Sequence, residues 1–272
     1  MPAVHPRPDL GRAPRRPLLS ARMDLAFARV AEAGQFVLRF FTHAFERPFH
    51  VREIVHQCYE VGYRSVPLIL LTGLVTGIVF TKQSRPSLEA FGASSWLPSL
   101  ITIALVRSLA PLVTALICAG KVGSSIGAEL GSMKVSEQIE AMEVSAINPF
   151  KYLVVTRTVA TTLMVPVLTV FCCVVGLVGS YLDVHANEAT TLAAFAKSGF
   201  STIGFLDLWS SLAKSVVFGF TIGIISCYHG FQASKGTRGV GLAANGSVVM
   251  SMFAIFIEEI VIVQVITWLR AI

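Results

Sequence analysis

Three ionisable side chains, Arg107, Lys214 and Glu258, lie inside long apolar runs of this 272-residue sequence. At the centre of a bilayer such a charge costs about 2.5–3.5 kcal/mol, so it usually serves a function or pairs with another charge. The two cations could bind an anionic headgroup while Glu258 balances their charge. Alternatively, all three could be salt-bridged packing residues, and the residue types alone leave both interpretations open.

Catalytic chemistry is not indicated. His185 and Glu188 do not form the HExxH pair of a zinc site, and no GxxxxGK[ST] phosphate-binding loop occurs. The five cysteines lack CxxC spacing, which predicts unpaired thiols and neither a disulfide nor a metal site. We therefore expect a non-catalytic chain that binds no metal and no cofactor of its own.

Composition predicts an all-α integral membrane protein. Apolar residues make up 54% of the chain and charged residues 14%, and the apolar residues gather in separate runs of membrane-spanning length. We expect one membrane domain over 23–272, with an interfacial helix at 23–46 and five transmembrane helices at about 54–81, 97–120, 152–182, 208–228 and 248–269.

The first predicted span carries a small-residue pair, Gly73 and Gly77, that permits close helix contact. Phe80 follows one turn later. We expect the first and fifth spans to line a central cavity, with these three residues near it.

The net charge of +6 is biased towards the N-terminus, where the first 64 residues hold ten Lys or Arg against six Asp or Glu. No basic patch is interleaved with aromatics, so nucleic-acid binding is not expected. The positive-inside rule instead predicts a cytoplasmic N-terminus, and five spans then put the C-terminus outside. The Pro- and Arg-rich residues 1–22 are predicted to be a disordered tail.

Between the second and third spans, 120–149 reads as a soluble insert with glycines followed by a short amphipathic helix. Ser136 is its expected N-cap. An acidic helix is atypical of a lipid-facing surface, so we expect it to dock on a soluble protein. The expected docking residues are Val135, Glu137, Gln138, Ile139, Glu140, Met142 and Glu143, with Ala146 completing the apolar stripe.

The run AGKVGSSIGAELGSMKVSEQIEAMEVSAINPFKYLVVTR, residues 119–157, resembles the signature of MlaE/YrbE-type permeases, AGRxGSAxxAExGxMxxTEQIxAMxxMxxxPxxxLxxPR. The similarity extends from about Val51 to the C-terminus. The matching residues are Gly120, Gly123, Ser124, Ala128, Glu129, Gly131, Met133, Glu137, Gln138, Ile139, Ala141, Met142, Pro149, Leu153 and Arg157. Departures are Lys121 for arginine, Ser136 for threonine and Thr156 for proline.

This resemblance implies a homodimeric permease of an ABC transporter in the bacterial inner membrane, moving phospholipids or related hydrophobic lipids. ATP and Mg would bind to a separate cytoplasmic ATPase, and the acidic helix would be the coupling helix that docks on it. An MCE-domain protein would receive or deliver the lipid outside. Family members often carry Arg-Glu where this chain has Arg107-Ser108. The alternatives are a stand-alone secondary transporter or channel for a hydrophobic or anionic solute, or a membrane scaffold.

Overall fold

The computed structural model describes residues 21–44, 46, 50–188 and 190–271, and these are helical or in turns, without a strand. The predicted all-α class is thus confirmed, whereas residues 1–20 of the predicted tail lie outside the described part. The chain divides into two units, Met1–Arg39 and Phe40–Ile272. Helix α1 (Ala21–Ala44) begins in the first unit.

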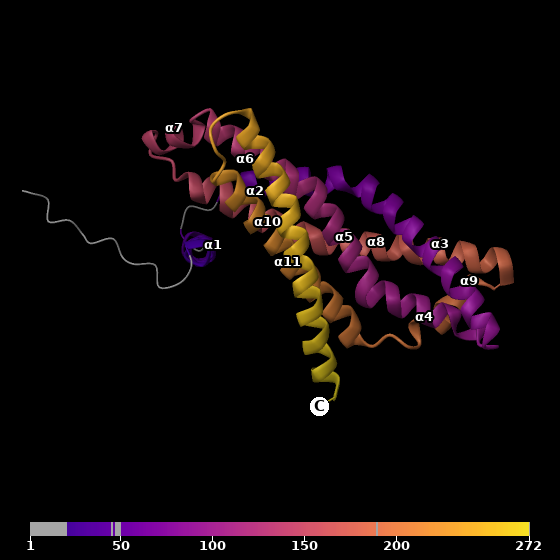
Figure 1. Ribbon diagram of the computed structural model, residues 1–272. Helices are drawn as coiled ribbons and strands as arrows, with labels where there is room; N and C mark the ends of the chain where they lie inside the picture. The colour runs from indigo at the N-terminus through magenta and orange to yellow at the C-terminus, as the bar shows by residue number, and fades with distance from the viewer. Residues whose placement is uncertain (1–20, 45, 47–49, 189, 272) are drawn as a thin grey trace, which may run out of the picture. The chain divides into compact units, whose positions relative to one another are not determined.

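The second unit holds the membrane helices (Figure 1). Five helical segments among the described residues are long and apolar enough to cross a membrane, as predicted: Val51–Ala90, Ser94–Val135, Phe150–Asn187, Phe205–Phe231 and Thr237–Trp268. Their elements in chain order are α2 (Val51–Val61), η1 (Tyr63–Ser65), α3 (Val66–Ala90), η2 (Ser94–Trp96), α4 (Leu97–Ala104), η3 (Leu105–Leu109), α5 (Ala110–Cys118), η4 (Ala119–Gly123), α6 (Ser124–Val135), α7 (Gln138–Val144), η5 (Phe150–Val155), α8 (Thr156–Glu188), α9 (Leu192–Phe200), α10 (Phe205–Phe231) and α11 (Thr237–Ala271).

The helices extend well past the runs of highest hydropathy. The first span was expected to end at about residue 81, but α3 continues to Ala90, and Arg85 in this extension pairs with Asp183 in α8 at 2.7 Å. The expected soluble insert is also shorter than its glycines suggested. Its first part, through Val135, continues the second span as η4 and α6, because the glycines there pack against neighbouring helices.

Glycines set the spacing of three central helices. A Cβ on Gly77 of α3 would lie 2.0 Å from the carbonyl oxygen of Gly176 in α8, so only glycine fits this crossing. Gly219 of α10 is also constrained, with a Cβ position 2.6 Å from the carbonyl oxygen of Thr161 in α8. Close backbone approach of this kind is how membrane helices gain packing energy. Helix α8 is therefore in backbone contact with both α3 and α10.

The second span contains two wide π turns, η3 and η4. Pro111 follows the first of them, and its nitrogen cannot donate to the carbonyl of Arg107 four residues earlier. That carbonyl instead accepts a hydrogen bond from Lys214 Nζ at 3.2 Å. The π turn and the proline together leave this backbone acceptor available to a side chain of another helix. Such π turns are frequent at functional sites.

Helix α11 packs less completely than the others. Only 11% of the most apolar stretch of α11 is buried, against 50% of the corresponding stretch of α10. The outer face of α11 exposes Phe253, Ile257 and Ile260, and its lower end in Figure 1 reaches the start of α10, where Arg270 pairs with Asp207. Lipid or another protein therefore has to cover this face.

Candidate functional site

Helix α10 carries polar residues at seven-residue intervals, Asp207, Lys214 and Thr221. Seven residues are close to two turns, so the three side chains follow one face of the helix, about 10 Å apart. Each of them binds a charged side chain of another helix. We call these three residues and their partners the polar ladder.

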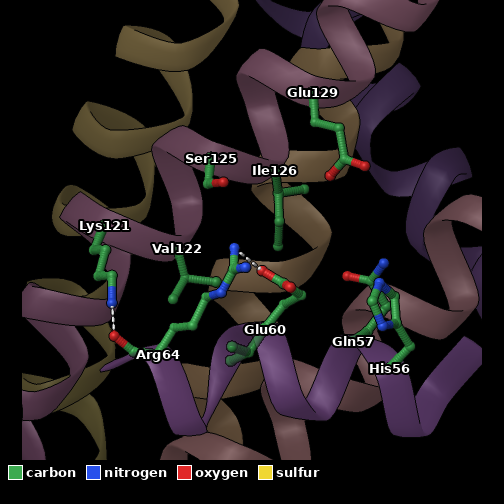
Figure 2. Close-up of a pocket in the computed structure, with 10 residues that line it drawn as sticks. His56, Gln57, Glu60, Arg64, Lys121, Val122, Ser125, Ile126 and Glu129 are labelled. Atoms are coloured by element: carbon green, nitrogen blue, oxygen red, sulfur yellow. Dashed lines mark hydrogen bonds and ion pairs between the residues drawn. The ribbon is translucent and has the colours of Figure 1, made fainter. Parts of the chain in front are cut away.

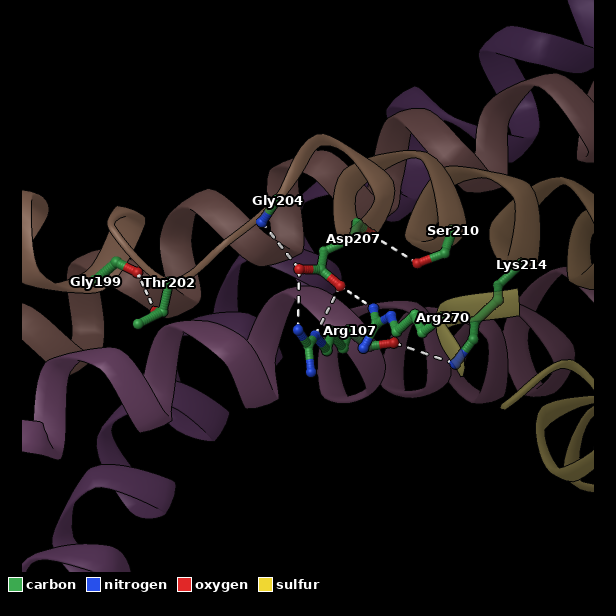
Figure 3. Close-up of polar contacts among 8 residues, drawn as sticks. All are labelled: Arg107, Gly199, Thr202, Gly204, Asp207, Ser210, Lys214 and Arg270. Carbon is green, nitrogen blue, oxygen red and sulfur yellow. Dashed lines mark hydrogen bonds and ion pairs between the residues drawn. The ribbon is translucent and has the colours of Figure 1, made fainter. Parts of the chain in front are cut away.

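The first level of the polar ladder is Asp207, in the first turn of α10 (Figure 3). Its carboxylate lies 2.8 Å from Nε of Arg107 and accepts a hydrogen bond from Nη2 of the same residue at 3.0 Å. Arg270 near the end of α11 donates to the same carboxylate. Asp207 also accepts a bond from the backbone N–H of Gly204, which fixes its orientation.

The second level is Lys214, whose side chain is only 2% exposed. Its ammonium lies 2.7 Å from Oε1 of Glu259 in α11 and also donates to the carbonyl of Arg107. A buried ammonium needs such partners, since an unpaired one is strongly destabilising. Lys214 thus connects α10 with α11 and with the π turn of the second span.

Glu258 does not pair with either cation, contrary to the expectation that it balances their charge. Its Oε1 accepts a hydrogen bond from Thr221 at 2.5 Å, which forms the third level of the polar ladder. Adjacent residues on a helix point about 100° apart. Glu259, one position later, is therefore directed at Lys214 and takes the role predicted for Glu258.

A cavity of about 190 Å³ adjoins the first two levels. Its lining combines cationic side chains with apolar side chains of α11 and consists of Arg107, Ser108, Ser210, Lys214, Val263, Ile266, Thr267 and Arg270. The ladder here brings together three cations and two carboxylates, an excess of one positive charge among the described residues. The arrangement can accept a small anionic group beside an apolar surface.

The other residues expected near a central cavity lie elsewhere. Gly73 and Gly77 are buried in the crossing of α3 with α8, so they do not line an open path within this chain. Phe80 borders an apolar pocket of about 670 Å³ with Trp96 and Leu100. The spacing of Gly73 and Gly77 indicated their role in helix packing, but it did not indicate that they lie away from the polar ladder.

The predicted docking helix is α7, and it is shorter than expected. Val135 ends α6, and Glu137 follows in the left-handed region with φ of 59°, so the chain turns before α7 begins. Ser136 is not the N-cap, because its hydroxyl donates to the carbonyl of Ser132 at the end of α6. Ala146 lies beyond the helix, also with φ of 59°.

The predicted apolar stripe does not face outward as a whole. Ile139 is buried and Met142 half-buried, so these residues hold α7 in place. Val144, by contrast, is 89% exposed, and Ile147 is also exposed. Gln138, Glu137 and Glu143 surround them as exposed polar residues.

Lys134 at the end of α6 donates a hydrogen bond to Glu140 of α7. This bond lowers the pKa of Glu140, with a weaker contribution from Lys235. Glu140 therefore has a cationic partner within this chain rather than an unpaired carboxylate.

Several partners were missed from the sequence. Asp207 and Arg270 lie at the ends of apolar runs, where charged residues need no explanation, yet the seven-residue spacing from Asp207 to Lys214 was a usable signal. Arg157 and Glu129, both within the signature run, form an ion pair of 2.7 Å in which Arg157 is buried. This pair joins α6 to the start of α8.

Comparisons with known proteins place this architecture. The family model described as Permease MlaE matches residues 54–265. A probable ABC transporter permease of Rickettsia typhi is 36% identical over 217 residues, covering 80% of this chain and 84% of the relative. A probable ABC transporter permease of Synechocystis is 34% identical over 237 residues, covering 87% and 90%.

The protein TRIGALACTOSYLDIACYLGLYCEROL 1, chloroplastic, of Arabidopsis thaliana is 34% identical over 230 residues, covering 85% of this chain and 65% of the relative. These matches cover the five spans and the signature run. They therefore favour an ABC transporter permease over a stand-alone transporter, a channel or a scaffold. The chain is a multi-pass membrane protein that belongs to the MlaE family of ABC transporter permeases.

Proposed function

We propose that this permease moves phospholipids or related hydrophobic lipids between the inner membrane and an MCE-protein conduit, driven by a separate cytoplasmic ATPase. The chain itself does not catalyse; it supplies the membrane path and a surface for the ATPase.

The cation-lined cavity beside the polar ladder is the observation that carries this proposal. A phospholipid joins an anionic phosphate to apolar chains, and the cavity lining combines Arg107, Lys214 and Arg270 with apolar side chains of α11. A guanidinium group can donate two parallel hydrogen bonds to the oxygens of one phosphate. Arg107 and Arg270 both bind the carboxylate of Asp207, and a phosphate beside it would be within reach of the same pair of guanidinium groups. The name of the Arabidopsis relative refers to a galactosylated diacylglycerol, which also supports a lipid substrate.

A second copy of this chain is the proposed cover for α11. Five spans offer little wall around a lipid-sized cavity, and the exposed face of α11 is contiguous with the side of the cavity formed by Val263, Ile266 and Thr267. Cysteine pairs placed on the first and fifth spans should cross-link between copies in native membranes. A protein that stays monomeric in membranes and in mild detergent would exclude this assembly.

The proposed orientation puts α7 in the cytoplasm, where the ATPase docks, and the C-terminus outside, where the MCE protein is met. The basic bias of the N-terminal residues supports this orientation through the positive-inside rule.

Lipid transfer by the reconstituted permease with its ATPase tests the function. Arg107→Gln keeps a polar side chain but removes the charge, and we expect phospholipid transfer to fall about tenfold or more, as for loss of one charged hydrogen bond. ATPase copurification should be unchanged. Lys197→Gln, an exposed lysine on α9, is the matched control and should transfer normally. Normal transfer by Arg107→Gln and also by Arg270→Gln would contradict a headgroup role for this cavity.

A further inference from the structure

A second polar cavity, of about 490 Å³, lies between α2 and the segment formed by η4 and α6 (Figure 2). It is at the end of the bundle that carries α7, because α2 begins the first span and α6 ends the second. The polar ladder does not contribute to it. Its lining is His56, Gln57, Glu60, Val61, Arg64, Lys121, Val122, Ser125, Ile126 and Glu129.

Side chains of both charges line this cavity. Lys121 and Arg64 lie together at one end, where Lys121 Nζ donates to the backbone carbonyl of Arg64. Glu129 lies towards the other end, held by Arg157 at 2.7 Å yet with half of its side chain exposed. Glu60 lies between them and pairs with Arg64 at 2.6 Å. The cavity thus offers cations and carboxylates to one ligand.

The π turn η4 is what directs Lys121 into the cavity wall. Lys121 lies in the middle of this wide turn, and the neighbouring Gly123 packs against Ser226 of α10 on the opposite side. A π turn holds an additional residue, so it changes the direction of the side chains relative to a regular helix. Lys121 is exposed, although it is part of a span-length helix.

The outer face of α2 indicates what lies next to the cavity. Val51, Val55 and Tyr59 of α2 and Tyr63 at the start of η1 recur every fourth residue and are each more than half exposed. The rings of Tyr59 and Tyr63 stack with centroids 5.0 Å apart. Tyrosines of this kind mark the level of lipid headgroups, with the exposed aliphatic face of α3 continuing into the hydrocarbon. The cavity is therefore on the inner side of a helix whose outer side suits a membrane interface.

We propose that this cavity binds the headgroup of an aminophospholipid, such as phosphatidylethanolamine. The phosphate contacts Lys121 and Arg64, and the ammonium contacts Glu60 and Glu129. Phosphate is matched by a lysine and an arginine, while a primary ammonium has three N–H donors for carboxylate oxygens. A headgroup with both charges fits better than a purely anionic one, because the two carboxylates repel additional negative charge.

This site does not depend on the proposed transport function, since a lipid held here could be either carried or retained. It also differs from the cavity at the polar ladder in having carboxylates accessible beside its cations. The binding experiment therefore uses the permease alone, without the ATPase and without a transfer readout.

The test measures lipid binding to the purified full chain in detergent by native mass spectrometry. The probes are dioleoyl phosphatidylethanolamine, phosphatidylglycerol and phosphatidylcholine. We expect phosphatidylethanolamine to bind tightest, because the other two lack the primary ammonium. Soluble glycerophosphoethanolamine should compete weakly for the same site, and inorganic phosphate more weakly still. Competition by both at equal strength would identify a free-phosphate site and overturn the proposal.

Variants locate the binding. Lys121→Gln should weaken phosphatidylethanolamine and phosphatidylglycerol alike, by about tenfold. Glu60→Gln should weaken only phosphatidylethanolamine, so that the preference between the two lipids shrinks. Ser125→Trp leaves every charge in place but fills the cavity, and it should also reduce binding. Lys197→Gln is the control and should bind as the unaltered chain.

Arg107→Gln separates this site from the transport cavity, since it should leave the phosphatidylethanolamine preference intact even where transfer is lost. Unchanged binding in Lys121→Gln, Glu60→Gln and Ser125→Trp would overturn the proposal. So would a loss of ATPase copurification in these variants with lipid binding preserved, because the cavity would then receive a protein side chain.

Discussion

The ammonium of Lys214 lies 2.7 Å from a carboxylate oxygen of Glu259, so one buried ion pair joins α10 to α11. The same ammonium donates a hydrogen bond to the backbone carbonyl of Arg107, to which Pro111 cannot donate because it has no N–H. Together with the pair of Arg270 and Asp207, this ion pair ties the C-terminal part of α11 to α10.

Lys214→Met should destabilise the protein by about 3–5 kcal/mol, because it leaves the carboxylate of Glu259 buried without a cation. Adding Glu259→Leu should restore most of that loss, since replacing both charges removes the desolvation penalty. Adding Glu258→Leu instead should not, because Glu258 binds Thr221. Thermal unfolding in detergent measures all four proteins. Rescue by Glu258→Leu would show that the pairing is wrongly assigned.

Gly77→Ala should destabilise the protein by about 1–3 kcal/mol, as for an overpacked core. The added methyl carbon would lie 2.0 Å from the carbonyl oxygen of Gly176, so α3 and α8 would have to separate. Gly241→Ala in α11 is the control, because its Cβ meets nothing within 4 Å. It should be neutral or gain up to about 1 kcal/mol from helix propensity. Equal unfolding temperatures for the two variants would contradict the close crossing.

Val144→Asp should abolish copurification of the ATPase while membrane insertion stays normal. Val144 is almost fully exposed, so the new charge costs nothing in the free permease but a few kcal/mol once a partner covers it. Met142→Asp is less informative, because Met142 is half-buried and its loss could act through folding. Ser145→Asp adds the same charge one residue later and serves as the comparison. An intact complex with Val144→Asp would exclude α7 as the dock.

Lys134→Gln should raise the pKa of Glu140 back towards that of an ordinary glutamate, because the hydrogen bond from Lys134 is the main cause of its lowering. The carboxyl of the unfolded chain has the higher pKa. The contribution of this ion pair to stability is therefore complete above that ordinary pKa and is lost as the pH falls through the lower, folded value. Carbon-13 titration of labelled glutamates, with Glu140→Gln for assignment, measures the change.

Lys235→Gln is the comparison for that titration, because Lys235 acts on Glu140 only through a weaker charge interaction. It should shift the pKa less than Lys134→Gln does. A larger shift in Lys235→Gln would mean that α7 is held by the loop before α11 instead of by the end of α6.

The number of spans could be predicted because apolar runs of sufficient length report membrane helices directly. Their ends could not, since polar and glycine-rich turns also stay helical where another helix covers them. Gly127 illustrates this: its Cβ position is 2.3 Å from the Ser247 hydroxyl, so a residue that suggested a loop is a tight helix contact.

The charged residues of the site could be identified from their cost in a membrane, but their pairing could not. Glu258 and Glu259 are the same residue type at adjacent positions. Which of them reaches Lys214 depends on the orientation of α11 about its own axis. The partner of Arg107 is a hundred residues away in sequence, in the first turn of α10. The π turns were likewise invisible, because no residue type specifies them.

The glycine crossings of α8 divide the mechanical behaviour of the bundle. Helices α3, α8 and α10 touch through their backbones, and sliding one past another would drive carbonyl oxygens into Cα atoms. These three helices therefore form a rigid unit. Helix α11 packs against α6 and α10 and leaves its outer face open, so fewer neighbours restrain it. Helix α6 packs against both α7 and α11, so a displacement of α7 would reach α11 through α6 without moving α3, α8 and α10 past one another.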